Sequence, residues 1–340
     1  MDEINSHALN NSVFLTSLWQ LTWIESLAYK PFMLLFYLEK NIIGLAFIGK
    51  QKSAWGDVYY LNQTGKHAGD QVWIEQNDII CAEQHKIACR HAFLERLITI
   101  PNFHKVVLSH TIDINWSHHK ALLWDKIIHK SARVKLEALL SKEVDYLSTL
   151  SKNSRSTLRR AKKYIETHYG QIEFKVVNEQ KAKTLKNDIA KLHIQKWGES
   201  QYGSGFVNPQ FTEFHTRMCE QKERELETEI IAFTAGRKIL GYLYFINKHP
   251  TANFYLSAID YSDGSNKFKP GLVMHALAIE YFVGKKYQYY DFLAGDARYK
   301  ESLSNDHYYM YTLELTSTHP VNKILFGLKS ILKKLRRTKG

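Results

Sequence analysis

Residues 229–248 read EIIAFTAGRKILGYLYFINK, two apolar and β-branched runs separated by a short polar turn. Residues 32–50 read FMLLFYLEKNIIGLAFIGK and have the same layout. When Gly44 is aligned with Gly241, two further pairs coincide: Phe36 with Phe233, and Ile42 with Ile239. Each stretch predicts a β-hairpin, and the shared pattern indicates an internal repeat.

The elements that follow each hairpin also recur in the same order. A strand, a helix and a closing strand are predicted at 57–65, 85–98 and 105–113 in the first copy, and at 253–260, 271–286 and 287–295 in the second. One β-β-β-α-β unit is therefore written twice. This pattern predicts an α/β (α+β) fold, with a last strand at 308–317.

Composition and length exclude several protein classes. The chain has 340 residues, of which 44% are apolar, 24% charged and 13% aromatic, as in folded proteins. This length predicts about two domains. The apolar run from Phe32 to Leu38 is far shorter than the roughly 20 residues that a membrane-spanning helix requires. The N-terminus has no basic segment and the three cysteines form no CxxC pair, so we expect a cytoplasmic protein without a secretory signal.

The basic charge is concentrated at the C-terminal end. The net charge is +12, and residues 319–340 contribute seven Lys and Arg residues and no acid. Leucines recur at helical spacing from Leu325 to Leu335, which predicts a basic amphipathic helix. Two interpretations stay open: its apolar stripe docks on the protein itself, or residues 320–340 rest on an anionic inner-membrane surface.

A helix is predicted between the two copies, at 151–170. SKNSRSTLRRAKKYIETHYG opens with Ser and Asn residues suited to capping and closes at Gly170. Four basic residues lie three to four positions apart and so share one face: Arg155, Arg159, Lys162 and Lys163. This face is either a solvated surface or a cationic wall for phosphates. A second helix is predicted at 181–200, followed at 201–211 by a loop beside a site.

The motifs of several enzyme classes are missing from the sequence. It has no GxSxG, HExxH, Walker or GxGxxG motif, which argues against triad hydrolases, zinc proteases, P-loop enzymes and Rossmann dehydrogenases. No Cys/His cluster has zinc-binding spacing, and the adjacent His118 and His119 are interpreted as surface or core residues. We therefore expect no metal.

The junction before the second repeat's helix is suited to an anionic ligand. NFYLSAID is followed by the loop YSDGSNKFKPG and by a helix that starts near Gly271. Backbone N–H groups and the positive end of a helix favour a pyrophosphate at such a junction. The predicted binding residues are consecutive or nearly so: Lys267, Lys269, Pro270, Gly271 and Leu272. The first copy lacks the lysines and the Pro-Gly pair at the matching position.

Polar residues cluster where the closing strand of the second copy ends. The segment DFLAGDARYK supplies carboxylates, a guanidinium, a phenol and an amine within ten positions: Asp291, Asp296, Arg298, Tyr299 and Lys300. Ligand contacts in open α/β sheets often lie at the carboxyl ends of strands. We therefore expect part of the site here.

Three segments together resemble a known family: LSKNSRSTLRRAKK, KWGES…SGF, and PGLVMHALAIEYFVGKKYQYYDFLAGDARYK. They are similar to the GNAT-fold acyltransferases of the CelD/BcsL polysaccharide-biosynthesis group, whose architecture is similar to that of the Fem peptidyltransferases. The similarity covers roughly residues 145–305 well and the first half in outline. It implies two tandem GNAT-like domains, at 1–145 and 146–318, each a mixed, largely antiparallel sheet flanked by helices, with the amphipathic tail at 319–340.

The resemblance also implies a mechanism and a co-substrate. GNAT-like enzymes bind an acyl thioester and an acceptor together, and the acceptor attacks the thioester carbonyl directly. Acetyl-CoA or another acyl-CoA is the implied co-substrate. However, the family's Arg/Gln-x-x-Gly-x-Gly/Ala loop is reduced to KFKPGL in this sequence, so coenzyme A use is implied by the resemblance alone.

Roles follow for the candidate residues. Asp291 is the expected base and Tyr299 the expected acid, and Lys300 completes the catalytic set. Arg298 and Lys300 would hold a phosphate or carboxylate of the substrate. The remaining candidates are Trp197 and Phe206, as an apolar or sugar-stacking wall, and Glu314 and Tyr308, as reserves for proton transfer.

Three functions stay open at this point. The first is an acyl-CoA-dependent N- or O-acyltransferase for a cell-envelope sugar, glycolipid or polysaccharide precursor, at the inner face of the membrane. The second is a Fem-like transferase that uses aminoacyl-tRNA, the only case in which we expect a nucleic-acid partner. The third is a non-catalytic membrane or nucleic-acid binder on the same fold.

Overall fold

The structure is a computed structural model, and it describes residues 12–116, 118–141, 145–198, 203–221, 226–320 and 322. The predicted C-terminal amphipathic helix lies almost wholly outside these residues. The chain forms two compact units. Unit 1 contains residues 1–17, 28–129 and 310–340, and unit 2 contains residues 18–27 and 130–309. The sequence predicted a boundary at 145/146, with the last strand in the second domain. In the structure, residues 130–145 belong to the second unit, and most of the last strand belongs to the first unit.

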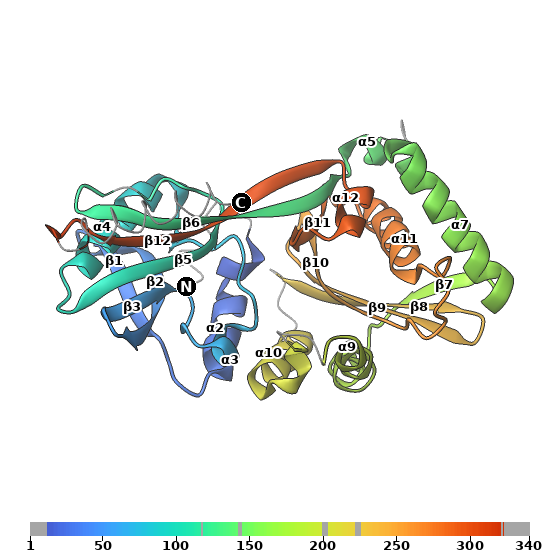
Figure 1. Cartoon of the computed structure of the whole chain (residues 1–340), viewed down its shortest axis with the longest axis horizontal. Helices are drawn as coiled ribbons and strands as arrows, with labels where there is room; N and C mark the ends of the chain where they lie inside the picture. Colours follow the sequence, from blue (N-terminus) through green and yellow to red (C-terminus); the bar gives the residue numbers. More distant parts are fainter. Residues whose placement is uncertain are drawn as a thin grey trace, which may run out of the picture. The chain divides into compact units, whose positions relative to one another are not determined.

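Unit 1 is a mixed sheet with helix α4 packed on it (Figure 1). Its strand order is β1-β2-β3-β5-β12-β6, and β4 pairs with β2. Buried Phe93, Leu94 and Leu97 of α4 form its core together with residues of β2, β3 and β5. The elements are η1 (Val13–Leu15), β1 (Phe32–Leu38), β2 (Asn41–Ser53), β3 (Gly56–Leu61), α3 (His67–Asp70), β4 (Ile80–Cys81), η2 (Glu83–His85), α4 (Lys86–Ile98), β5 (Phe103–Thr111), the first part of β6 (Ala121–Lys135) and most of β12 (Asp306–Ser317).

Unit 2 is a mixed sheet with helices on both faces. The strand order is β6-β11-β10-β9-β8-β7. Helices α7 and α11 lie on one face, and α9 and α10 lie on the other (Figure 1). The elements are most of α2 (Ser17–Ser26), the end of β6, α5 (Glu137–Leu140), α6 (Tyr146–Thr149), α7 (Lys152–Tyr169), β7 (Ile172–Val176), α8 (Lys181–Thr184), the π-helical turn η3 (Leu185–Ile189), α9 (Ala190–Trp197), η4 (Gly205–Val207), α10 (Pro209–Glu220), β8 (Glu227–Ala235), β9 (Lys238–Asn247), β10 (Thr251–Ile259), α11 (Pro270–Gly284), β11 (Tyr289–Ala294) and α12 (Arg298–Leu303).

The repeat predicted from the sequence is confirmed in strand register. Phe36 pairs with Gly44 in the β1/β2 hairpin, and Phe233 pairs with Gly241 in the β8/β9 hairpin. In both hairpins the register shifts directly after the phenylalanine. In both units the helix then connects two parallel strands, β3 with β5 and β10 with β11. The predicted fold class, mixed sheets flanked by helices in two copies, is therefore confirmed.

Helix α7 begins and ends where its sequence predicts. The Ser151 hydroxyl accepts a hydrogen bond from the Ser154 amide at 3.1 Å, and Gly170 follows the helix with a φ of 102°. The apolar side, which includes Leu158, Ala161 and Ile165, is buried in the core with α11. The N-terminal half of the helix can therefore form a wall beside the start of α11.

The expected loop at 201–211 is partly helical where it is described. Ser204 caps the short turn η4, and Asn208 caps α10, which begins at Pro209. A proline at the first helical position is compatible with a helix start because its missing N–H would have no partner there. In the described part of the chain, no helix is long and apolar enough to cross a membrane. All three cysteines are free.

Candidate active site

A cavity of about 670 Å³ opens in unit 2 between α7, α11 and α12. Trp197, at the end of α9, also lines it. Six of the predicted site residues line the cavity: Trp197, Lys269, Gly271, Leu272, Arg298 and Tyr299. We call this cavity the main pocket.

The main pocket lies where two parallel strands separate. Strands β10 and β11 pair over three residues each, from Thr251 with Tyr289 to Asn253 with Asp291. Beyond these pairs β10 continues to Ile259 and β11 to Ala294. Ser257 and Ile259, on the continuing part of β10, line the pocket. The pairing of β10 with β11 therefore ends before the part of β10 that lines the pocket.

The start of α11 supplies the anion-binding part of the pocket. Pro270 occupies the first turn and Lys269 the N-cap position, where its side chain makes no cap bond. The first-turn N–H groups of a helix have no partner within the helix, so those of Gly271 and Leu272 are suited to bind an anion. A Cβ on Gly271 would approach Ile259 Cδ1 to 2.9 Å, so glycine keeps this approach open.

Acidic side chains hold the loop before α11 in shape. Lys238 pairs with Asp260 at 2.9 Å, and the Asp260 carboxylate accepts from the Ser262 amide. Asp263 accepts from the Ser265 amide at 2.9 Å and from the Tyr164 and Tyr169 hydroxyls. Phe268, which is buried, lines the pocket at the end of this loop. These contacts fix the loop that leads into α11.

Tyr299 and His275 form an aromatic pair in the pocket wall. Their rings stack at 5.2 Å with an interplanar angle of 18°. Burial raises the pKa of the Tyr299 phenol, which stays protonated at neutral pH. Burial, with the nearby Lys300 charge, lowers the pKa of His275 to about 3. Its Nδ1 lies 2.6 Å from the Tyr290 hydroxyl.

His275 was missed in the sequence analysis, although a signal for it exists. It lies four residues after Gly271 on α11, and positions i and i+4 share a helix face. Ser154 and Thr157, three residues apart on α7, line the pocket for the same reason. Their contribution depends on α7 packing beside α11, which local sequence patterns do not show.

Asp291 and Lys300 are buried and do not line the main pocket. The Asp291 side chain accepts hydrogen bonds from the Leu293 amide at 2.8 Å and from the Tyr308 hydroxyl at 2.9 Å. Burial raises the pKa of Asp291 to about 6. The Lys300 ammonium donates to the carbonyls of Phe292 at 2.8 Å and of Ala294. Both residues therefore hold the end of β11 in place, and Tyr308 takes part through Asp291.

A second cavity of about 490 Å³ adjoins the main pocket. Arg298, Ser154 and Ser302 line both cavities. Two carboxylates line the second one, Asp296 and Glu301. Glu301 is paired with Lys130 at 2.7 Å and with His307 at 3.0 Å, whereas Asp296 is exposed at the rim. We call this space the side cavity.

The other predicted residues lie elsewhere. Phe206 is buried, with its ring 5.1 Å from Phe211 and 5.4 Å from His193, and it does not line the main pocket. Glu314 belongs to unit 1, where it pairs with Lys105 at 2.9 Å. Lys267 lies in the loop, where its amide donates to the Ser265 hydroxyl at 3.2 Å.

Comparison with known proteins identifies the part of the chain that holds these cavities. Residues 152–301 match the family of acetyltransferase (GNAT) domains. No curated protein sequence matches the chain. The match favours an enzyme over a non-catalytic binder.

Solved structures share the fold across nearly the whole chain. The crystal structure of FemX has a TM-score of 0.58 at 8% identity, over 96% of this chain and 97% of that chain. The C-terminal domain of a putative lysylphosphatidylglycerol synthetase from Agrobacterium fabrum has a TM-score of 0.52 at 10% identity, over 97% and 95%. L-PGS from Bacillus licheniformis has a TM-score of 0.51 at 10% identity, over 93% and 92%.

These identities are too low to transfer a substrate, so the solved structures bear on the fold alone. The family match adds the class of reaction. The main pocket lies almost entirely within the matched range, and the side cavity lies partly within it. Residues 152–301 are therefore similar to acetyltransferase (GNAT) domains, and this match supports an acyltransferase.

Proposed function

We propose that the chain transfers an acyl group from an acyl-CoA, such as acetyl-CoA, to an amine or hydroxyl acceptor bound in the same complex. One observation carries the proposal: within the matched GNAT domain, the uncapped start of α11 opens into a pocket of about 670 Å³. The pocket combines an anion-binding end with an apolar interior, as a coenzyme A thioester requires.

The donor would lie with its pyrophosphate at α11. The Gly271 and Leu272 amides would donate to it, and the Lys269 ammonium would compensate its charge. The pantetheine arm would then follow β10 past Ile259 and Ser257 into the main pocket. This places the thioester end near Tyr299 and His275.

The acceptor would enter through the side cavity. Its nitrogen or oxygen attacks the thioester carbonyl; the new C–N or C–O bond forms and the C–S bond breaks. The acceptor gives up a proton to a base, and the leaving thiolate takes one from an acid. Tyr299 is our candidate acid because it lines the main pocket and because burial keeps its phenol protonated at neutral pH.

We assign the base to Asp296, because its carboxylate is exposed and lines the side cavity. Asp291, the base expected from the sequence, acts in this proposal as a positioning residue for the end of β11. Arg298 lines both cavities and would bind an anionic group of the donor or acceptor.

The proposed class of acceptor rests on the resemblance to the CelD/BcsL group, and the proposed location of the protein rests on that resemblance and on the basic tail. We propose an envelope sugar, glycolipid or polysaccharide precursor as acceptor, with the protein in the cytoplasm at the inner membrane face. The seven basic residues of 319–340 support contact with anionic lipids.

A Fem-like transferase using aminoacyl-tRNA is the second candidate. One observation favours it: Arg159, Lys162 and Lys163 are exposed on α7, the helix whose first turns line the main pocket. Arg155, in contrast, donates to the Leu150 carbonyl at 2.7 Å and serves the helix start. Binding of tRNA by this face would weaken steeply with salt.

Calorimetric titration with acetyl-CoA separates these candidates. We compare the wild type with a Lys269→Ala/Gly271→Asp variant, and with Lys286→Ala/Gly284→Asp as the matched control. The control makes the same change of charge at the opposite end of α11, where a Cβ on Gly284 would meet no atom within 4 Å.

We expect micromolar binding by the wild type and the control, and none by the Lys269/Gly271 variant. If the wild type binds none of the three ligands, acetyl-CoA, longer acyl-CoAs and free coenzyme A, the acyl-CoA proposal is wrong. Salt-sensitive binding of tRNA in that case would favour the second candidate.

A further inference from the structure

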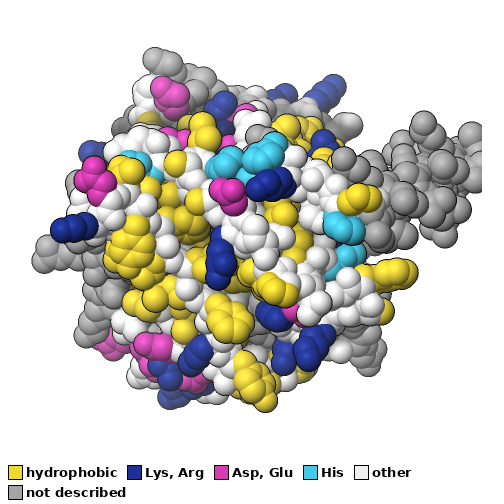
Figure 2. Space-filling view, turned by 90° about the vertical axis from the view of Figure 1, so that its left-hand side faces the viewer, with side chains coloured by type: hydrophobic (Ala, Val, Ile, Leu, Met, Phe, Trp, Pro, Cys, Tyr) yellow, Lys and Arg dark blue, Asp and Glu magenta, His cyan; other side chains and the backbone are white. Residues whose placement is uncertain are grey.

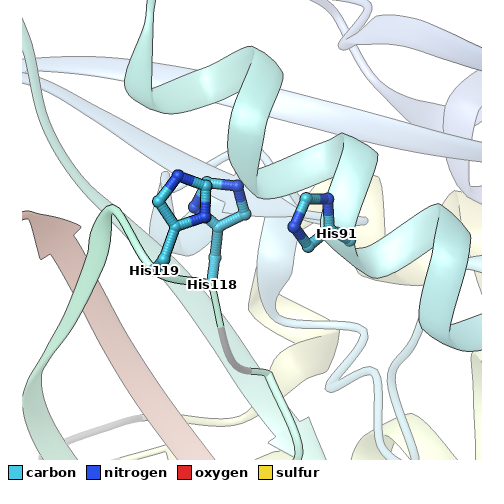
Figure 3. Close-up of side chains that lie close together, drawn as sticks. All are labelled: His91, His118 and His119. Carbon is cyan, nitrogen blue, oxygen red and sulfur yellow. The ribbon is translucent and has the colours of Figure 1, made fainter.

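Three histidines of unit 1 meet at the surface, outside the acyltransferase domain. His91 lies on α4, and His118 and His119 lie in the segment that leads into β6. One ring nitrogen from each can be chosen so that all three atoms lie within 4.8 Å of one another. Figure 3 shows the three rings side by side, with the pair from the segment facing the one from the helix.

The chain holds this segment against α4 through residues next to the histidines. Arg90, the neighbour of His91, donates to Asp78 at 3.0 Å and pairs with Asp113. Its guanidinium lies 4.8 Å from the Trp116 ring, and that buried ring packs against Phe93. The buried contacts of Arg90 and Trp116 therefore hold the two histidine-bearing segments together.

One nitrogen of the cluster has no partner. His118 is only 7% exposed, and its Nε2 is buried without a hydrogen bond. The other nitrogen, Nδ1, accepts from the Lys120 amide at 3.1 Å. An unsatisfied buried polar atom is costly, and it calls for an explanation such as an ion.

The charges around the cluster are compatible with a cation. His91 and His119 are exposed, and Glu95 lies one turn after His91 on α4. Glu95 pairs with Lys120 at a loose 3.8 Å. Figure 2 shows a group of histidine side chains open at the surface, with a basic and an acidic side chain beside it.

We propose that His91, His118 and His119 bind a divalent transition-metal ion of the zinc class. Three imidazoles are a common ligand set for Zn²⁺, and imidazole also suits Ni²⁺ and Cu²⁺. The fourth position is left to water or to the Glu95 carboxylate. The spacing of residues in the sequence predicted no metal site. This proposal differs because the ligands come from two segments that only the fold brings together.

The site closes with small side-chain movements. Zn–N bonds of about 2.0–2.1 Å place tetrahedral nitrogens roughly 3.3 Å apart. The rings of His91 and His119 are exposed and free to turn inward from their present spacing, while His118 stays fixed. Binding through His118 Nε2 requires that ring's proton on Nδ1, so the Lys120 amide, which donates to Nδ1 in this structure, turns away from the ring when the metal binds.

The ion would stabilise unit 1 without taking part in acyl transfer. All three ligands belong to unit 1, whereas the residues that line the main pocket belong to unit 2. A metal held by both segments ties α4 to the entry of β6. Metal binding to the folded state alone raises the unfolding temperature.

The test uses the untagged, full-length chain, stripped with a chelator and titrated with ZnCl₂ in a calorimeter. The variants are His91→Gln, His119→Gln and the double variant, which change exposed residues only. His67→Gln, an exposed histidine of α3, is the control. Co²⁺ absorption reports directly on tetrahedral coordination by the protein.

We expect one Zn²⁺ per wild-type chain, a Zn²⁺-dependent rise in unfolding temperature, and a Co²⁺ spectrum of tetrahedral type. Each single variant should bind at least about tenfold more weakly, and the double variant should lose the site, with His67→Gln unchanged. Equal Zn²⁺ binding by the wild type and the folded double variant, or no binding by the wild type, would overturn the proposal.

Discussion

At the level of single residues, the stacked pair of Tyr299 and His275 is the part of the main pocket best suited to chemistry. Both rings are largely buried and both line the cavity. Burial acts on the two groups in opposite directions, since it raises the pKa of the phenol and lowers that of the imidazole. Both therefore stay neutral at pH 7, and the phenol keeps the proton that an acid must donate.

Replacing Tyr299 by Phe tests this role. The ring and its stacking on His275 remain, but the hydroxyl proton is lost. We expect kcat to fall by about 10² or more, as for the loss of a general acid, with unchanged affinity for acetyl-CoA. Steady-state kinetics and calorimetry measure the two effects separately. An unchanged kcat would show that the leaving thiolate is protonated from elsewhere.

Asp291 gives a second prediction, on stability. Its pKa is raised to about 6 in the folded protein, against about 3.9 in an unfolded chain. Between these values the folded state binds more protons than the unfolded state, so the free energy of unfolding falls as pH rises through this window. Above pH 6 the buried charge costs on the order of 3 kcal/mol.

An Asp291→Asn variant cannot ionise and should lack this pH dependence. Urea unfolding of both proteins from pH 4 to pH 8 gives the difference between their profiles, in which effects common to both, such as that of His275, cancel. We expect the wild type to lose stability relative to the variant as pH rises from 4 to 6. A difference that does not change with pH contradicts the raised pKa.

At the level of elements, the two hairpins share a register in which a phenylalanine faces a glycine at the bulge. Gly241, opposite Phe233, has a φ of 145°, and a Cβ there would lie 2.4 Å from the Ala258 carbonyl oxygen. The close approach of β9 and β10 at this point therefore depends on glycine. It also sets the course of β10 towards the pocket.

Gly241→Ala should therefore destabilise the protein by about 3 kcal/mol, from backbone strain and the clash combined. Gly264→Ala is the matched control. Gly264 also has a positive φ, of 73°, but a methyl group on its Cα would meet no atom within 4 Å. Its replacement should cost only about 1 kcal/mol. Equal losses in chemical denaturation would mean that the Ala258 contact relaxes freely.

At the level of the whole molecule, one fold unit occurs twice but the described ligand-binding features differ. In unit 2 the repeat's helix begins with Pro270 and Gly271 at the main pocket. In unit 1 the corresponding helix α4 follows the short turn η2 and carries His91 instead. In our proposals, the duplicated architecture therefore serves acyl transfer in one copy and metal binding in the other.

The basic tail gives a prediction at this scale. Deleting residues 320–340 removes seven positive charges and should release the protein from vesicles that contain anionic lipid, with little change in unfolding temperature. Vesicle sedimentation and thermal unfolding check the two parts. Neutral vesicles serve as the control. If the shortened protein aggregates or unfolds at much lower temperature, the tail is a docked structural element.

The sequence by itself determined the features that depend on neighbours in the chain. The hairpins, the caps of α7 at Ser151 and Gly170, and the start of α11 follow from local patterns, and the structure confirms them. The repeat could be read because the same pattern occurs twice.

Only the tertiary structure decided which polar residues line the main pocket. Asp291 and Lys300 lie in the predicted region, but contacts with Tyr308 and with the carbonyls at the end of β11 use their polar atoms. His275 joins the pocket because α12 packs beside α11, and His91 meets His118 because Arg90 and Trp116 hold two distant segments together. Burial and partners depend on residues far apart in the chain, and a local pattern contains no information about them.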